Sequence, residues 1–198
     1  MKIGITGGIG SGKSHVSKII GDAGYTVLNA DVIAKQIMVE DESVRELIVS
    51  TFGDESYKGK ELNRTYIASK AFSSVENLTK LNSIVHPPMV YEINELLEQE
   101  LKKNKIVFVE AALIFEAEVD EILDHVLLVT ADEELRISRI KERDQLSEAE
   151  IRDRMNFQIP ENEKENLADF TIKNNSTLVD LEMKTKMFII IFKSMGGE

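Results

Sequence analysis

Eight residues near the amino terminus constrain the fold more than any other feature of this chain. Residues 7–14 read Gly-Gly-Ile-Gly-Ser-Gly-Lys-Ser and directly follow the apolar run at residues 2–6. The spacing fulfils the G-x-x-x-x-G-K-S pattern of a phosphate-binding loop, which stands between a strand and the helix that follows it. The pattern therefore predicts an amino-terminal strand, a glycine loop and a helix that begins at Lys13.

This loop supplies the groups that hold nucleotide phosphates. Glycine adopts backbone conformations that a Cβ would obstruct, so the loop amides turn inward and ring the phosphate oxygens. Lys13 is expected to reach the β- and γ-phosphates of ATP, and Ser14 to offer its hydroxyl to Mg²⁺. A chance glycine-rich turn is the alternative, which the flanking strand and helix disfavour. The predicted ATP contacts of the loop are Gly8, Ile9, Gly10, Ser11, Gly12, Lys13, Ser14 and His15.

Short apolar runs alternate with longer segments of helical period along the rest of the chain. Such alternation predicts an α/β fold in which helices cover a parallel sheet. A closing helix is expected to begin after Ser176 and to be buried. The expected strands are residues 2–6, 26–29, 105–110, 125–130 and 170–173.

About 75 residues without a convincing strand separate the second and third expected strands, whereas a crossover needs only about a dozen. The segment shows helical periodicity, including stretches before and after His86-Pro87-Pro88, and residues 53–59 resemble a flexible loop. We therefore expect an inserted helical lobe at residues 31–104 that binds a substrate.

Two acidic residues follow expected strands, at the edge of the sheet where ligands bind in open parallel sheets. Asp31 is a candidate general base that accepts the proton of an attacking hydroxyl, and a helix cap is the equal alternative. Glu110 is a candidate for holding Mg²⁺ through water, with a buried strand end as the alternative. The apolar run after Glu110, which includes Leu113 and Phe115, predicts either a pocket wall or ordinary core packing.

An arginine-rich helix is expected after the fourth strand. Arg136, Arg139 and Arg143 are spaced three and four apart, so they are expected to share one helical face and to converge on a phosphate. A solvated charged helix is the alternative. We expect a lid at residues 136–158, in which Arg139 and Arg143 contact the transferring phosphoryl group, with Arg154 as a weaker candidate.

Two further patterns belong to the carboxyl-terminal half. Ser147 and Glu150 have the spacing of a capping box, which predicts a second lid helix. Asn174 and Asn175 end the fifth expected strand, where their amides would read the adenine edge or form a turn.

Composition limits the remaining possibilities. The chain has 198 residues, 42% of them hydrophobic, which fits one domain over residues 1–198. Its formal net charge of -11 argues against nucleic-acid or acidic-membrane binding. It has no cysteine and no apolar run near the roughly 20 residues of a membrane helix. We expect a cytoplasmic monomer and leave a homo-oligomer open.

A phosphate loop alone does not name the reaction, because kinases, motor ATPases and regulatory GTPases share it. The nearest candidate for a guanine-reading Asn-Lys-x-Asp motif, residues 104–107, lacks the aspartate, which disfavours a GTPase. The residues themselves support a small-molecule kinase without naming its acceptor.

The chain resembles the dephospho-CoA kinase family over nearly its whole length. The string Thr-Gly-Gly-Ile-Gly-Ser-Gly-Lys-Ser at residues 6–14 is the most specific part of this resemblance. The other matching residues are Ala30-Asp31, Ile33-Ala34, Leu81, His86-Pro87, residues 113–116, Arg143-Asp144, Leu146-Ser147, Gln158, residues 167–169 and Asn174-Asn175.

The resemblance implies transfer of the ATP γ-phosphoryl group to the ribose 3′-hydroxyl of dephospho-CoA. It implies Asp31 as the base, His86 in a lobe that grips the CoA side, and a three-layer fold with five parallel strands, like the nucleoside monophosphate kinases. The sequence departs from the family pattern at three positions. Asn29 replaces an aspartate, Ala112 replaces a proline, and His15 stands where threonine is common.

Overall fold

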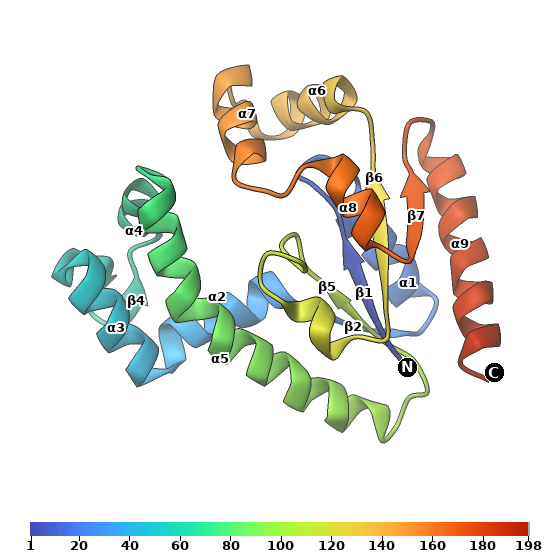
Figure 1. Ribbon diagram of the computed structural model, residues 1–198, viewed down its shortest axis with the longest axis horizontal. Coiled ribbons are helices and arrows are strands. Elements are labelled where there is room, and N and C mark those ends of the chain that lie inside the picture. Colours follow the sequence, from blue (N-terminus) through green and yellow to red (C-terminus); the bar gives the residue numbers. More distant parts are fainter. Residues whose placement is uncertain (198) are drawn as a thin grey trace. The chain divides into compact units, whose positions relative to one another are not determined.

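The structure is a computed structural model, and it describes residues 1–197. The chain divides into two compact units (Figure 1). Unit 1 contains residues 1–29 and the chain from Glu95 onward, and unit 2 contains residues 30–94. The phosphate loop, the arginine helix and all five expected strands belong to unit 1.

Unit 1 is built on a five-stranded parallel sheet whose strand order is β2-β5-β1-β6-β7. The sequence prediction of five parallel strands is confirmed, and only β5 begins two residues later than expected. The central strand β1 pairs with β5 and β6, so the phosphate loop leaves the middle of the sheet. The strands are β1 (Lys2–Thr6), β2 (Thr26–Asn29), β5 (Val107–Glu110), β6 (His125–Thr130) and β7 (Phe170–Lys173).

Both faces of this sheet are covered (Figure 1). Helices α1 (Lys13–Asp22) and α9 (Leu178–Met195) cover one face, where fully buried Ile5, Phe108 and Phe192 join the main core. The loop after β5, which contains the short helix η2 (Val119–Ile122), and α8 (Glu161–Leu167) cover the other. The three-layer α/β architecture inferred from the sequence is therefore confirmed.

Helix α1 ends in the way its sequence predicts. Gly24 has a φ of +94°, a left-handed conformation that favours glycine. Its amide donates to the carbonyl of Gly21, and the amide of Tyr25 donates to the carbonyl of Ile20. These two bonds form a Schellman motif, which satisfies the last carbonyls of the helix and turns the chain into β2.

The closing helix α9 differs from its prediction in two ways. Thr177, and not Ser176, caps it, because its side chain accepts from the amide of Asp180. The helix is also not buried all round, since only one stripe packs on the core while Met183 and Ile190 are exposed. No helix in residues 1–197 has the length and apolarity needed to cross a membrane.

The expected lid consists of α6 (Glu133–Asp144) and α7 (Glu148–Asn156). The capping box is present, because Ser147 accepts from the amide of Glu150 while Glu150 accepts from that of Ser147. The two helices share a small core of Ile137, Ile140 and Ile151, and Ile9 of the phosphate loop packs against it. This apolar contact joins α6 and α7 to the loop.

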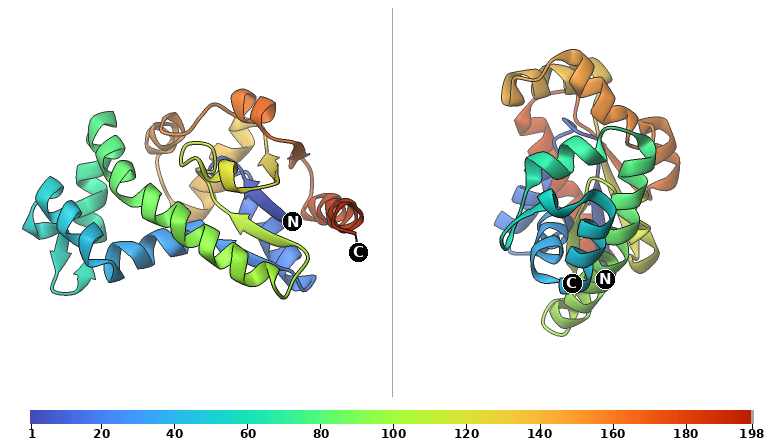
Figure 2. Two further views of the ribbon diagram at one scale, coloured as in Figure 1. Left: turned by 60° about the horizontal axis from the view of Figure 1, so that its bottom comes forward. Right: turned by 90° about the vertical axis from the view of Figure 1, so that its left-hand side faces the viewer.

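Unit 2 is largely helical, as its sequence predicts (Figure 2). Its own core is formed by Val44, Ile48, Phe52, Ile67 and Val85. The segment expected to be a flexible loop is instead ordered into the short helix η1 (Asp54–Ser56) and a two-stranded hairpin. The remaining elements are α2 (Ala30–Glu40), α3 (Glu42–Phe52), β3 (Tyr57–Lys58), β4 (Glu61–Leu62), α4 (Arg64–Ala71) and α5 (Val75–Leu101), of which residues 95–101 belong to unit 1.

The helical stretches before and after His86-Pro87-Pro88 form one continuous helix. Helix α5 runs through Pro87 and Pro88, although each proline lacks the N–H group that would bond the preceding turn. Val85 and Met89, which flank the prolines, are both buried, so the apolar stripe of the helix continues across them. Packing therefore outweighs the local preference for a break.

Substitution of Phe192 tests the assignment of the main core of unit 1. Its ring lies 5.3 Å from that of Phe170 and 6.0 Å from those of Phe108 and Phe188, measured between centroids. We expect Phe192→Ala to lower the free energy of unfolding by about 3–5 kcal/mol in urea denaturation. Exposed Ile190 is the matched control, and Ile190→Ala should change it by less than about 0.5 kcal/mol. Equal effects of both variants would contradict this core assignment.

Candidate active site

The phosphate loop is held in a shape that only glycine permits at two positions. Gly10 and Gly12 have φ angles of +82° and +99°. A Cβ on Gly12 would lie 2.4 Å from Nδ2 of Asn174, and one on Gly10 would lie 2.8 Å from the carbonyl oxygen of Arg136. Both the backbone conformation and the close neighbours therefore exclude a side chain at these positions.

The amides of the loop fall into two groups. Among residues 1–197, no protein atom accepts from the backbone N–H groups of Gly10, Gly12, Lys13 or Ser14. Such open N–H groups at the start of a helix attract anions, and the helix dipole adds to this attraction. This part of the loop therefore fits the phosphates of a nucleotide.

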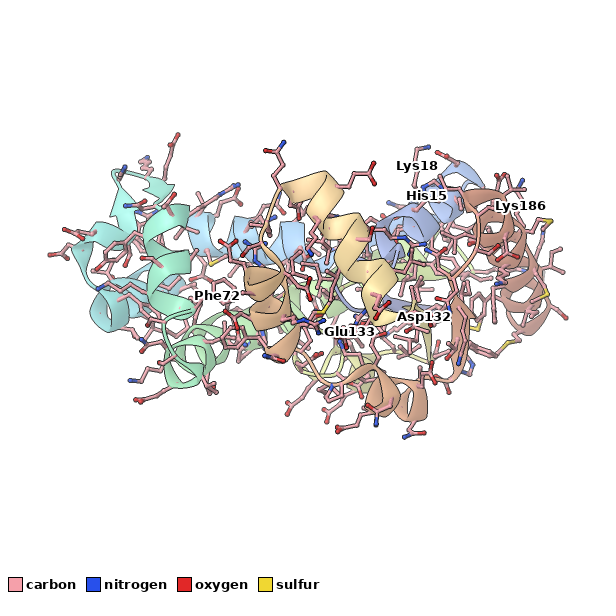
Figure 3. All side chains as sticks on the ribbon, turned by 90° about the horizontal axis from the view of Figure 1, so that it is seen from above. His15, Lys18, Phe72, Asp132, Glu133 and Lys186 are labelled. Atoms are coloured by element: carbon pink, nitrogen blue, oxygen red, sulfur yellow. The ribbon has the colours of Figure 1, made fainter. Side chains whose placement is uncertain are left out.

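The amides of Gly8 and Ile9 are instead engaged within the protein. The amide of Gly8 donates to Oε1 of Glu161 at 3.1 Å, and that of Ile9 donates to Oε1 of Gln158 at 3.1 Å. The amide of His15 donates to the carbonyl of Gly12. His15 itself lies on α1, the helix that packs against α9 (Figure 3). Sequence reasoning placed Gly8, Ile9 and His15 at the nucleotide but did not find these internal partners.

Glu110 organises the reactive side chains of the loop. Its Oε1 accepts from Nζ of Lys13 at 2.6 Å and from Oγ of Ser14 at 2.8 Å, and its Oε2 accepts from Nδ2 of Asn29 at 3.2 Å. The residue is only 5% exposed. Burial raises the pKa of the Glu110 carboxyl, but the bonds from Lys13 and Ser14 outweigh it, so the pKa lies below its ordinary value.

The same oxygens suit a magnesium ion. Mg²⁺ prefers hard oxygen ligands and keeps several waters, binding through one or two protein groups and the substrate phosphates. Ser14 Oγ and Glu110 Oε1 supply such oxygens side by side. No cluster of three His, Asp or Glu side chains able to hold a metal occurs within residues 1–197. Ser14 and Glu110 therefore fit an ion that is shared with a nucleotide.

The three arginines of α6 do not converge as one group. Arg136 is buried and pairs with Glu161 at 3.0 Å. Arg139 reaches the phosphate loop, where Nη1 donates to the carbonyl of Gly10 at 3.4 Å and Nη2 to that of Asn174 at 3.0 Å. Arg143 is exposed and forms a two-bond pair with Asp144, with both distances 2.7 Å. Arg139 and Arg136 therefore reach the loop, at Gly10 and at Gly8, whereas Arg143 is paired with Asp144.

The two asparagines after β7 are both engaged by the protein. Asn174 is buried, and its Nδ2 donates to the carbonyl of Ser11 at 2.8 Å. Asn175 exchanges two bonds with Asp132, which Figure 3 labels at the start of α6. Their side chains tie β7 to the phosphate loop and to the lid helix.

The other predicted site residues are divided between the two units. In unit 1, Leu113 and Phe115 are half-buried in the loop after β5, whose turn between them buries Ile114 completely. In unit 2, Asp31 is exposed in the first turn of α2, and His86 lies within α5. Because Asp31 lies inside the helix, it is not the cap residue, although its charge favours the helix dipole.

A cavity of about 440 Å³ lies in unit 1 beside the phosphate loop. Its walls come from the end of β6, from α6 and α7, and from the segment that leads into α8. Arg136, Gln158 and Glu161 all line it. Gln158 and Glu161, which accept from the amides of Ile9 and Gly8, therefore also border this cavity.

Comparison with known proteins decides the family. The family model described as dephospho-CoA kinase matches residues 1–180. A dephospho-CoA kinase of Fusobacterium nucleatum is 39% identical over 189 residues, which cover 95% of this chain and 96% of that protein.

The chain belongs to the dephospho-CoA kinase family.

Solved structures agree with this assignment. The dephospho-CoA kinase from Campylobacter jejuni matches with a TM-score of 0.74 at 32% identity, covering all of both chains. The protein TT1252 from Thermus thermophilus matches with a TM-score of 0.78 at 35% identity, covering 96% of each chain. The resemblance seen in the sequence is therefore confirmed at the level of the family and the fold.

One departure of this dephospho-CoA kinase from its family pattern now has a physical explanation. Asn29 donates its amide to Glu110, so it adds a donor to a carboxylate that is already bound by Lys13 and Ser14. An aspartate at this position would place a second carboxylate against Glu110. The amide avoids that repulsion.

The lowered pKa of Glu110 predicts a pH-dependent contribution to stability. A carboxyl whose pKa is lower in the folded protein stabilises the fold above its unfolded value and loses this effect as pH falls. We expect the difference in unfolding free energy between the native protein and Glu110→Gln to be full above pH 4.5 and to shrink below it. Urea denaturation from pH 3 to 7 measures this, with exposed Glu163→Gln as the control. A difference that is independent of pH would contradict the charged pairing.

Proposed function

We propose that this protein transfers the γ-phosphoryl group of ATP to the ribose 3′-hydroxyl of dephospho-CoA, giving coenzyme A and ADP. The observation that carries the proposal is the match to the dephospho-CoA kinase family over residues 1–180. The open amides of the phosphate loop support it independently, because they suit the phosphates of ATP.

In this proposal the loop binds and orients ATP. The open N–H groups of Gly10, Gly12, Lys13 and Ser14 hold the phosphates, and the ammonium of Lys13 offsets their charge. Glu110 holds Lys13 and Ser14 side by side. When ATP binds, Lys13 leaves Glu110 for the phosphates of the nucleotide. Ser14 and Glu110 would hold magnesium, which would neutralise charge on the phosphates.

Asp31 is the proposed general base. It follows Asn29, the last residue of β2, by two positions along the chain, and Asn29 contacts Glu110. Its exposed carboxylate has no hydrogen bond or ion pair within the described residues. The group is therefore available to accept the proton of an acceptor hydroxyl.

The proposed roles of the lid arginines differ. Arg139 already lies against Gly10, so it is placed to stabilise charge on the transferring phosphoryl group. Arg143 must first exchange Asp144 for the phosphate, because the two side chains are paired at 2.7 Å. We propose residues 136–158 as the lid that carries both.

The acceptor is proposed to contact the lobe at residues 31–104, including His86, together with Leu113 and Phe115. The half-buried apolar side chains of Leu113 and Phe115 suit a nucleobase or another flat apolar group. Contact of Asn175 with adenine requires it to leave Asp132, so we propose Asn174 and Asn175 mainly as supports of the ATP site.

We further propose that the protein acts in the cytoplasm as a monomer, with a homo-oligomer as the alternative. The absence of cysteine from the sequence and the net charge of -11 support a protein that needs no disulfides and remains soluble.

Acceptor dependence tests the proposal. ADP formation should be measured with ATP and Mg²⁺ and with dephospho-CoA, AMP, shikimate or a nucleoside as acceptor. We expect turnover with dephospho-CoA and only background hydrolysis with the others. Phosphorylation of another acceptor without dephospho-CoA would support a different small-molecule kinase, and slow hydrolysis without any acceptor would support a nucleotide switch.

Asp31→Asn tests the proposed base. The variant keeps the size of the side chain but cannot accept a proton, so we expect turnover to fall by about 10²–10⁴-fold. The dissociation constant for ATP should stay within about threefold of the native value, because the carboxylate acts on the acceptor. Glu42→Gln, in the first turn of α3, is the matched control in unit 2. Unchanged turnover of Asp31→Asn would reduce Asp31 to a helix-stabilising charge.

A further inference from the structure

A short segment that begins at the last residue of the expected lid lies against the phosphate loop. Residues 158–161 run from the connection after α7 to the first residue of α8, and we refer to them as the strap. Gln158 at one end accepts from the amide of Ile9, and Glu161 at the other end accepts from the amide of Gly8. Two consecutive loop amides are therefore fixed by a segment about 150 residues away in sequence.

The strap is anchored on its other side by a buried ion pair. Lys164 of α8 is 0% exposed, and its Nζ lies 3.1 Å from Oε1 of Glu116. The same oxygen accepts from the amide of Ile159 in the strap at 2.9 Å. Because an unpaired buried charge is costly, this pair holds the strap and the loop after β5 together.

The carboxylate of Glu161 accepts three hydrogen bonds. Its Oε1 accepts both from the amide of Gly8 and from Nη1 of Arg136 at 3.0 Å, and its Oε2 accepts from Oγ1 of Thr130 at 2.6 Å. The side chains of Glu161 and Arg136 are 21% and 7% exposed. The carboxylate thus joins the phosphate loop, the end of β6 and the first turns of α6.

Gly8 shows how closely this pair approaches the loop. A Cβ on Gly8 would lie 2.1 Å from Nη1 of Arg136 and 2.2 Å from Oε1 of Glu161. The guanidinium also offsets the negative charge of Glu161, which would otherwise repel the phosphates of a nucleotide. The pair therefore gives the loop a hydrogen-bond acceptor with little added negative charge.

We propose that Glu161 is a positioning residue for phosphoryl transfer. By fixing the amide of Gly8, while Gln158 fixes that of Ile9, it holds the first half of the loop so that the amides of Gly10 to Ser14 face the phosphates of ATP. This inference rests on the proposed function, because it assigns Glu161 to the ATP side of the same reaction. The alternative is that Glu161 only neutralises buried Arg136.

A set of variants separates these two roles. Glu161→Leu removes both the acceptor and the charge, and Glu161→Gln keeps an oxygen acceptor without the charge. The double variant Arg136→Leu with Glu161→Leu removes the unpaired buried cation but does not restore the acceptor for Gly8. Glu163→Leu, at an exposed position of α8, is the matched control.

Three measurements are needed for each variant. Calorimetric titration with a non-hydrolysable ATP analogue and Mg²⁺, without an acceptor, gives the affinity for the nucleotide. Urea denaturation gives stability. Steady-state kinetics with dephospho-CoA then show whether the change lies in KM for ATP or in KM for the acceptor.

We expect Glu161→Leu to weaken nucleotide affinity about tenfold, the usual effect of losing a charge-assisted hydrogen bond. Glu161→Gln and Glu163→Leu should stay within about threefold of the native affinity. The double variant should regain stability relative to Glu161→Leu but keep the weakened affinity. KM for dephospho-CoA should be unchanged throughout.

Two results would overturn the proposal. Recovery of nucleotide affinity together with stability in the double variant would reduce Glu161 to the partner of Arg136. Native affinity in both Glu161→Leu and the double variant would show that the Gly8 contact does not shape the loop. Because the titration needs no acceptor, a protein that binds the nucleotide as expected but does not phosphorylate dephospho-CoA would disprove the proposed function alone.

Discussion

The buried carboxylate of Glu110 is the interaction on which the nucleotide site depends. It lies at the end of β5 and binds the ammonium of Lys13, the hydroxyl of Ser14 and the amide of Asn29. Helix α1 and strand β2 therefore meet strand β5, which lies 81 to 97 residues further along the chain, on one charged group. A carboxylate buried to this degree is tolerated because hydrogen-bond donors surround it. Among these groups, the ammonium of Lys13 suits the phosphates of a nucleotide, and the hydroxyl oxygen of Ser14 suits Mg²⁺.

The phosphate loop is supported on both sides of this centre. On one side, Arg139 and Asn174 bond the carbonyls of Gly10 and Ser11. On the other, the strap holds the amides of Gly8 and Ile9. The carbonyls and the first amides are thus engaged by the protein, while the later amides remain open. The loop owes its shape to its glycines and its rigidity to these partners.

Sequence patterns predicted much of this architecture because those features are local. The five strands, the end of α1 at Gly24 and the capping box at Ser147 follow from short-range periodicity and turn chemistry. The continuous helix α5 did not follow, because long-range packing overrides the two prolines. The three arginines of α6 have helical spacing, yet each binds a different partner. These partners are Glu161, Asn174 and Asp144. The roles of these partners depend on contacts that spacing along the chain does not encode.

The account reduces to one chemical claim, that a site organised by Glu110 delivers the γ-phosphoryl group of ATP to one hydroxyl of dephospho-CoA. Phosphorus NMR of the product formed from ATP, Mg²⁺ and dephospho-CoA tests it most directly. The account predicts a new phosphomonoester resonance that matches authentic coenzyme A with its phosphate on the ribose 3′-oxygen, formed together with ADP. Inorganic phosphate as the only new product, or a phosphate on another oxygen, would contradict it.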